Sequence, residues 1–281
     1  MNAASSPVYA TFTQEQLNRQ YDAAGTVPAI EPYYARFAAA SARALPGVRA
    51  ELDVPYGPGE RNRLDLFPAE RPGAPLFFFI HGGYWRRLDK SFFSFLAEPV
   101  VRAGGAAAVV NYPLAPAASI DDIVASVRGA FEWTVNNAAR LNADPERVVV
   151  GGHSAGGHLG GMLAGSQLRP AGLFALSGLF DLEPIRLSHV NEWTRLDAVS
   201  AERNSPVRRL PESPIPLVAA VGERETDEFK RQTHHYVETW RARRYPAEEL
   251  IAAGHNHFTI VLELADENTE LSRALAELLF D

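Results

Sequence analysis

Residues 147–161 read RVVVGGHSAGGHLGG, and this stretch decides the fold expected for the chain. An apolar run leads into the G-x-S-x-G pentapeptide centred on Ser154, and small and apolar residues that can form a helix follow it. Strand, sharp turn and helix in this order form a nucleophile elbow, in which a strained turn lifts the serine oxygen clear of the backbone. The flanking glycines remove side chains that would collide in the turn. The pattern predicts that Ser154 is a nucleophile, with an ordinary strand-to-helix turn as the alternative interpretation.

Length and composition are those of one α/β domain, which we expect to span residues 1–281. The chain has 281 residues, of which 46% are hydrophobic, and can bury a large core. Its net charge is −7 and no Lys/Arg cluster is long enough to follow a phosphate backbone, so we expect no nucleic-acid partner. The absence of cysteine excludes disulfides and Cys-ligated zinc.

A cytoplasmic location is also expected from the sequence, without a membrane partner. No segment approaches the roughly 20 apolar residues that a membrane helix needs. Residues 1–7 lack the basic region and apolar run of a secretory signal.

Buried strands alternate with helices through most of the chain. Two short strands at 51–55 and 63–67 flank a Gly-Pro-Gly turn and predict an antiparallel hairpin. Parallel strands that are covered on both faces are apolar throughout. Six further runs are apolar throughout or nearly so: 76–80, 106–111, 148–151, 173–177, 217–221 and 249–252. The alternation predicts an α/β protein with a mostly parallel, doubly wound sheet, whose ligand sites lie at the carboxyl ends of the strands.

Two segments stand outside this alternation. Residues 13–45 are predicted to form a helical N-terminal arm, on which Tyr33, Tyr34 and Phe37 recur at helical spacing. Such a stripe is usually core packing, although it could cover a pocket. Residues 183–214 have several prolines and mixed polarity, and we predict a cap insertion over the site. Apolar stripes on the terminal helices permit a homodimer but do not require one.

A serine hydroxyl is a weak nucleophile until a neighbouring base takes its proton, so the elbow also predicts a histidine and a carboxylate that orients it. In α/β-hydrolases the acid and then the histidine follow the serine along the chain. We predict that His257, after the last strand, is the base in preference to His255. The acid should follow the preceding strand, where GERETDE offers four carboxylates. Glu225, three residues after Gly222, is the first choice and Asp227 the alternative.

A second glycine-rich turn, HGGYW at residues 81–85, follows another apolar strand. An H-G-G loop in this place presents backbone N–H groups to a carbonyl oxygen as that oxygen becomes negative. We predict that Gly82 and Gly83 belong to this oxyanion hole, together with the N–H of Ala155. Neither glycine cluster has the spacing of a phosphate-binding loop.

Four aromatic residues are candidates for stacking on an aromatic substrate, with core packing as the alternative interpretation. They are Tyr84 and Trp85 beside the oxyanion loop, and Tyr33 and Tyr34 on the arm. The His-x-His pair near the C-terminus has no evident third ligand nearby, so we expect no metal. The predicted ligand is a small molecule.

Together these motifs resemble α/β-hydrolases of the kynurenine formamidase (arylformamidase) group, close to the hormone-sensitive-lipase-like esterases. The resemblance covers roughly residues 50–265. It rests on HGGYW at 81–85, GHSAGGHL at 152–159, SGLFDLEP at 177–184, ETDEFKRQ at 225–232 and His257-Phe258.

The resemblance implies cofactor-free hydrolysis of a small amide or ester through an acyl-enzyme, with an aryl formamide such as N-formylkynurenine as the first choice and a place in tryptophan breakdown. Ser154 would be the nucleophile, His257 the base and Glu225 the acid. The acid of this family is most often aspartate, and this departure leaves a role for Asp227 open. A general short-chain carboxylesterase with the same triad is the alternative, and a non-catalytic binding protein a remote one.

Overall fold

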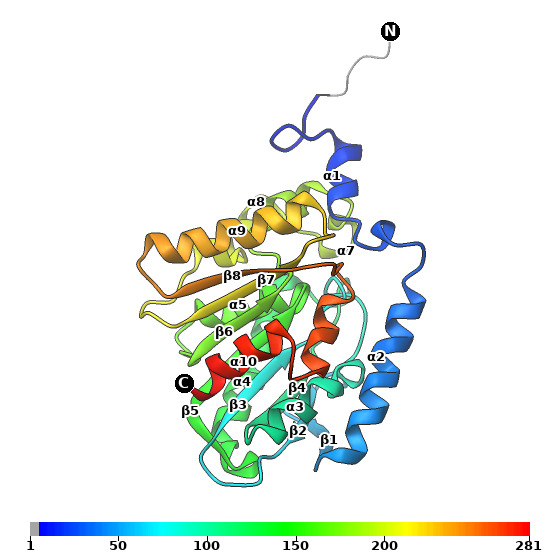
Figure 1. The fold of residues 1–281 in the computed structure, drawn as a ribbon. Coiled ribbons are helices and arrows are strands. Elements are labelled where there is room, and N and C mark those ends of the chain that lie inside the picture. Colours follow the sequence, from blue (N-terminus) through cyan, green and yellow to red (C-terminus); the bar gives the residue numbers. More distant parts are fainter. Residues whose placement is uncertain (1–5) are drawn as a thin grey trace.

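The computed structural model describes residues 6–281. The expectation about a secretory signal concerns residues 1–7 and therefore lies mostly outside the described residues. An eight-stranded sheet forms the centre of the described chain, in the order β1-β2-β4-β3-β5-β6-β7-β8 (Figure 1). Its strands are β1 Glu51–Pro55, β2 Arg63–Phe67, β3 Ala74–Ile80, β4 Ala106–Val110, β5 Ala143–His153, β6 Gly172–Leu176, β7 Leu217–Gly222 and β8 Ala247–Ala252.

The strand directions confirm the predicted sheet. β1 pairs with β2 and β2 with β4 in antiparallel fashion, and every other neighbouring pair is parallel. The strands β3, β4, β6 and β7 are buried at every position, as parallel strands covered on both faces must be. Ile80 of β3 pairs with Gly152 of β5, so the two glycine-rich turns leave the sheet side by side.

Helices cover both faces of the sheet. In Figure 1, α3 (Ala97–Arg102) and α10 (Glu270–Phe280) lie in front of it, and α10 packs across β3 and β5 to β8. Behind it, α4 (Ile120–Asn136) and α5 (Ala155–Ala164) pack against each other and against β5. The helix α9 (Asp227–Ala242) packs on β7 and β8.

The N-terminal arm consists of α1 (Gln14–Gln20), a 3₁₀ turn (Ala24–Thr26) and α2 (Glu31–Ala44), which runs along one side of the molecule in Figure 1. The segment 183–214 holds three short helices, α6 Glu183–Leu187, α7 Asn191–Thr194 and α8 Ala198–Arg203, and the 3₁₀ turn Pro206–Arg208. Further 3₁₀ turns span Leu45–Gly47, Lys90–Phe92, Ser94–Leu96, Ala138–Leu141 and Ile260–Ala265. Within residues 6–281, no helix has the length and apolar character needed to cross a membrane.

Buried polar contacts fasten the arm to α9. The hydroxyl of Tyr21 donates to Oε2 of Glu228 at 2.6 Å and accepts from Nε2 of Gln232 at 2.8 Å. Glu228 is 2% exposed, and its charge is balanced by a two-bond ion pair with Arg231. The hydroxyl of Thr226, just before α9, donates to the last carbonyl of α1. A buried charge needs such partners, so these contacts fix where the end of α1 lies.

Candidate active site

Ser154 occupies the sharp turn between β5 and α5. Its backbone has φ 57° and ψ −118°, a strained conformation for a residue with a side chain, and its N–H bonds to the carbonyl of Leu176 at 2.8 Å. A Cβ at Gly152 would lie 2.2 Å from the oxygen of Gly156, and a Cβ at Gly156 would lie 1.9 Å from the oxygen of Ile80. The turn therefore requires glycine at both flanking positions of the pentapeptide.

The structure brings three of the predicted residues into one hydrogen-bonded chain. The hydroxyl oxygen of Ser154 is 3.0 Å from Nε2 of His257, and Nδ1 of His257 is 2.6 Å from Oε2 of Glu225. All three side chains are buried. A carboxylate only accepts hydrogen bonds, so the imidazole proton lies on Nδ1 and the lone pair of Nε2 faces the serine hydroxyl. This is the arrangement in which a histidine can remove the serine proton.

The second carboxylate oxygen of Glu225 is held by two further donors. The hydroxyl of Ser177 donates to Oε1 at 2.6 Å, and the backbone N–H of Gly222 donates to it at 2.7 Å. Both donors stand at the carboxyl ends of strands, Ser177 directly after β6 and Gly222 at the end of β7. Sequence reasoning assigned Ser177 no role. The available signal was that Ser177 directly follows β6, which is the parallel neighbour of β7, so the residues at the carboxyl ends of both strands lie close together.

The two alternatives weighed from sequence lie elsewhere. Asp227 is in the first turn of α9, and no hydrogen bond or ion pair joins it to His257 in the described chain. His255 pairs through Nε2 with Glu263 at 2.8 Å. The geometry therefore favours Glu225 as the partner of His257.

A second histidine, His153, contacts the backbone and the ring of His257. Nε2 of His153 is 2.8 Å from the backbone oxygen of His257, and the two rings lie 4.8 Å apart between centroids. Burial lowers the pKa of His153 well below its usual value. His153 is therefore neutral, and its Nε2–H donates to that carbonyl. The ring of Phe229 lies 4.6 Å from the ring of His257 and limits its movement further.

Backbone N–H groups of the residues predicted to form the oxyanion hole lie near the serine. A Cβ at Gly82 would lie 3.2 Å from Cβ of Ser154, so the oxyanion loop runs directly past the serine side chain. The N–H groups of Gly82, Gly83 and Ala155 bond to no backbone carbonyl within residues 6–281. Ala155 is the first residue of α5, where N–H groups lack partners and the helix dipole favours negative charge. These groups can receive an oxygen that becomes negative.

The loop itself is held by His81, which is fully buried. Its Nδ1 is 2.7 Å from the oxygen of Gly82, and its ring stacks on Tyr112 with 4.4 Å between centroids. The hydroxyl of Tyr112 donates to the backbone oxygen of His81 at 2.8 Å. Burial lowers the pKa of His81 to about 4, so the ring is neutral near pH 7. The contacts of His81 are structural.

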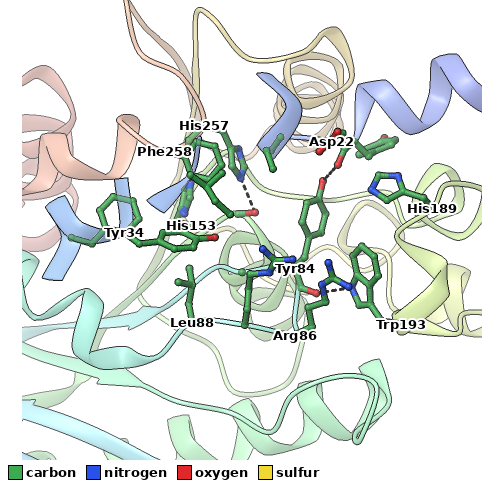
Figure 2. A pocket seen from close by; sticks show the side chains of 18 residues that line it. Asp22, Tyr34, Tyr84, Arg86, Leu88, His153, His189, Trp193, His257 and Phe258 are labelled. Atoms are coloured by element: carbon green, nitrogen blue, oxygen red, sulfur yellow. Dashed lines mark hydrogen bonds between the residues drawn. The ribbon is translucent and has the colours of Figure 1, made fainter. Parts of the chain in front are cut away.

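A cavity of about 140 Å³ opens at the serine. Its walls come from the arm, the oxyanion loop, the segment 183–214 and the loop after β8. The aromatic lining consists of Tyr21, Tyr34, Phe37, Tyr84, Trp193 and Phe258. Figure 2 shows His257 and Phe258 on one side of this cavity and Arg86 and Trp193 on another.

Two of the four predicted stacking residues line this cavity, namely Tyr84 and Tyr34. Trp85 does not, which corrects the expectation for it: the side chain is fully buried, and Nε1 donates to Nδ1 of His158 at 3.1 Å. Tyr33 does not either, because its ring packs on Phe258 with 5.1 Å between centroids.

Sequence reasoning missed several lining residues. Phe258 directly follows His257, and Arg86 directly follows Trp85. Asp22 and Trp193 come from segments without a recognisable motif. Among the described residues, no group of three or more His, Asp or Glu side chains is arranged to hold a metal ion.

Comparison with known proteins adds relatives of similar length. The family model described as BD-FAE matches residues 64–175. A kynurenine formamidase of Danio rerio is 28% identical over 96% of this chain and 97% of its own length. One of Salmo salar is 30% identical over 81% of each chain. The solved structure of a putative thioesterase from Silicibacter sp. TM1040 is 31% identical, with a TM-score of 0.82 over 95% of this chain and 99% of that one.

Proposed function

Because this chain belongs to the kynurenine formamidase family of α/β-hydrolases, we propose that it hydrolyses a small aryl formamide, such as N-formylkynurenine, through an acyl-enzyme on Ser154. The observation that carries the proposal is the hydrogen-bonded chain from Ser154 through His257 to Glu225. Its relatives identify the chain as a hydrolase of amides or esters. The proposal adds which residue is the nucleophile and which substrate is cleaved.

In the first half of the proposed reaction, the serine oxygen attacks the formamide carbon while Nε2 of His257 takes the hydroxyl proton. The carbonyl oxygen becomes negative and accepts hydrogen bonds from the N–H groups of Gly82, Gly83 and Ala155. The C–N bond then breaks as His257 gives its proton to the leaving nitrogen. The products of this half are a free arylamine and a formyl ester on Ser154.

In the second half, water takes the place of the amine. His257 removes a proton from the water, whose oxygen attacks the formyl ester, and the same N–H groups stabilise the oxyanion. The ester bond breaks, Ser154 recovers its proton from His257, and formate leaves. Glu225 keeps the proton of His257 on Nδ1 in both halves and balances the positive charge that the ring acquires.

The lining and the volume of the cavity support an aromatic substrate with a small acyl group. Ser154 lines the same cavity as the rings of Tyr34, Tyr84 and Phe258, and flat rings of this kind pack well against an aryl group. A formyl group is the smallest acyl group, and a cavity of about 140 Å³ has room for it beside an aromatic ring.

A short-chain ester or thioester hydrolase is the second candidate. The same geometry attacks any activated carbonyl, and the solved relative that matches almost the whole chain is called a putative thioesterase. Such an enzyme would cleave short acyl esters or thioesters well and the formamide poorly.

Initial rates on N-formylkynurenine, p-nitrophenyl acetate and p-nitrophenyl butyrate separate the two. We expect kcat/KM above about 10⁴ M⁻¹s⁻¹ on the formamide. The variant Ser154→Ala should lose activity on all three substrates. Ester turnover without formamide turnover would reject the formamidase proposal and favour the second candidate, and full activity of Ser154→Ala would reject both.

A further inference from the structure

Two neighbouring arginines in the cavity have no acidic partner. Arg86 and Arg87 directly follow the oxyanion loop and line the cavity that contains Ser154. In the part of the chain that the structure describes, no carboxylate lies within ion-pairing distance of either guanidinium. Burial and the charge of Arg87 lower the pKa of Arg86, and the charge of Glu192, which forms no ion pair with it, opposes this shift only in part. Two adjacent cations that line a cavity and form no ion pair make a site for an anion.

Arg86 is held in a defined orientation. Its guanidinium carbon lies 3.6 Å from the centre of the Trp193 ring, which is a cation–π contact. The indole N–H of Trp193 donates to the backbone oxygen of Tyr84 at 3.0 Å and fixes the ring on which the guanidinium rests. A guanidinium stacked on its face keeps its N–H edge for a ligand, and its planar fork matches a carboxylate. Binding therefore requires little ordering of this side chain.

An anion of the protein lines the same cavity. Asp22 is exposed, and its Oδ1 accepts a hydrogen bond from the N–H of Gly25 at 3.0 Å. It forms no ion pair with a cation among residues 6–281. Figure 2 shows Asp22 near the hydroxyl end of Tyr84 and Arg86 near the other end of that residue. Asp22 and Arg86 thus place opposite charges in the lining of one cavity.

We propose that Arg86, Arg87 and Asp22 form a receptor for the amino-acid group of the substrate, with the arginines on its carboxylate and the aspartate on its ammonium. This inference rests on the proposed function, because it places the scissile formamide at Ser154 and the amino-acid group at the far end of the substrate. Each charged group of a zwitterion then meets a protein charge of opposite sign. The predicted substrate class is zwitterionic aryl formamides, in preference to neutral ones of the same shape.

The test compares N-formylkynurenine with the ortho-formamido phenyl ketone that lacks the amino and carboxylate groups. Wild-type enzyme should prefer the zwitterion, mainly through a lower KM. Arg86→Gln should reduce the ratio of the two kcat/KM values by about 10-fold or more, because a hydrogen bond to a charged group is lost. Asp22→Asn should reduce the same ratio, and Arg86→Lys should recover part of it. Arg36→Gln removes an exposed arginine of α2 outside the cavity and should leave the ratio unchanged.

Equal kcat/KM values of wild-type enzyme on the two formamides would overturn the inference, as would a ratio that Arg86→Gln and Asp22→Asn leave unchanged. A loss of folding in a variant is recognised by its melting temperature. If wild-type enzyme cleaves neither formamide, the proposed function fails, and inhibition of p-nitrophenyl acetate hydrolysis by kynurenine tests the receptor alone. We expect competitive inhibition that weakens about 10-fold in Arg86→Gln. Absence of inhibition in the wild-type enzyme would reject the receptor as well.

Discussion

Glu225→Gln should lower kcat by about 10³-fold while the protein remains folded. In the structure one oxygen of Glu225 accepts from Ser177 and Gly222, and the other accepts from His257. A glutamine side chain has one oxygen and one NH₂ group. The oxygen will stay with the two donors that it already serves, and the NH₂ group will then face Nδ1 of His257.

The size of the effect follows from this mismatch. The lost bond is charge-assisted and contributes roughly 1.5–3 kcal/mol, and a buried donor left without an acceptor costs roughly 1–3 kcal/mol more. The sum is about 4 kcal/mol, which corresponds to about 10³-fold in rate. The imidazole escapes the mismatch by moving its proton to Nε2, but in that tautomer it cannot accept the proton of Ser154.

The assay is kcat at saturating p-nitrophenyl acetate and N-formylkynurenine, with a thermal melt to show that the variant folds. Glu225 does not line the cavity, so KM should change less than kcat. Asp227→Asn is the matched control, since it removes a carboxylate two positions away, and it should keep kcat within about 2-fold because surface substitutions have small effects. Retention of more than about a tenth of kcat by Glu225→Gln, or an equal loss in Asp227→Asn, would refute the reasoning.

Three further outcomes follow from individual contacts. Ser177→Ala removes the hydroxyl that holds Glu225 and should lower kcat about 10-fold; wild-type kcat would show that the bond has no part in positioning the acid. Gly156→Ala places a Cβ 1.9 Å from the oxygen of Ile80 and should cost about 3 kcal/mol in urea unfolding, whereas an unchanged midpoint would contradict the packing of the turn. His158, whose pKa burial lowers from 6.5 to about 4, is neutral when folded and binds a proton more readily when unfolded, so the free energy of unfolding falls as pH drops from 6.5 toward 4. At pH 5 this loss is about 2 kcal/mol for one such histidine. The free energy of unfolding, measured by urea titration at pH 7 and at pH 5, should therefore differ by about 2 kcal/mol less in His158→Gln than in the wild-type protein. An equal difference in both proteins would show that His158 is not responsible.

The sheet was predictable because its information is local. A buried parallel strand has to be apolar along its whole length, and the run Phe77-Phe78-Phe79 identifies β3 without any reference to its neighbours. The elbow was predictable for a steric reason, since the collisions at Gly152 and Gly156 leave no other residue possible. Each of these constraints is visible within a few positions of the sequence.

The walls of the cavity were not predictable in the same way. Asp22 comes from the arm and Trp193 from the segment 183–214. They line the same cavity because long-range contacts, such as the hydrogen bond from Tyr21 to Glu228, fix the position of the arm. No local sequence pattern predicts that these two residues line one cavity. Trp85 shows the converse error, since it adjoins the oxyanion loop in sequence but turns into the core to bond His158. Sequence motifs therefore identify Ser154, His257 and Glu225, which hydrogen bonds join in the structure, better than they identify the residues that line the cavity.

Labelling with a fluorophosphonate tests the central claim most directly, because the reagent reacts with a serine only where a base and an oxyanion hole are in place. The labelled protein is digested to map the modified residue, and hydrolysis of N-formylkynurenine is followed on the same samples. We predict one label, on Ser154, and a loss of formamide hydrolysis in proportion to the fraction labelled. A label on another residue, or full formamide turnover by protein whose Ser154 is completely modified, would contradict the account.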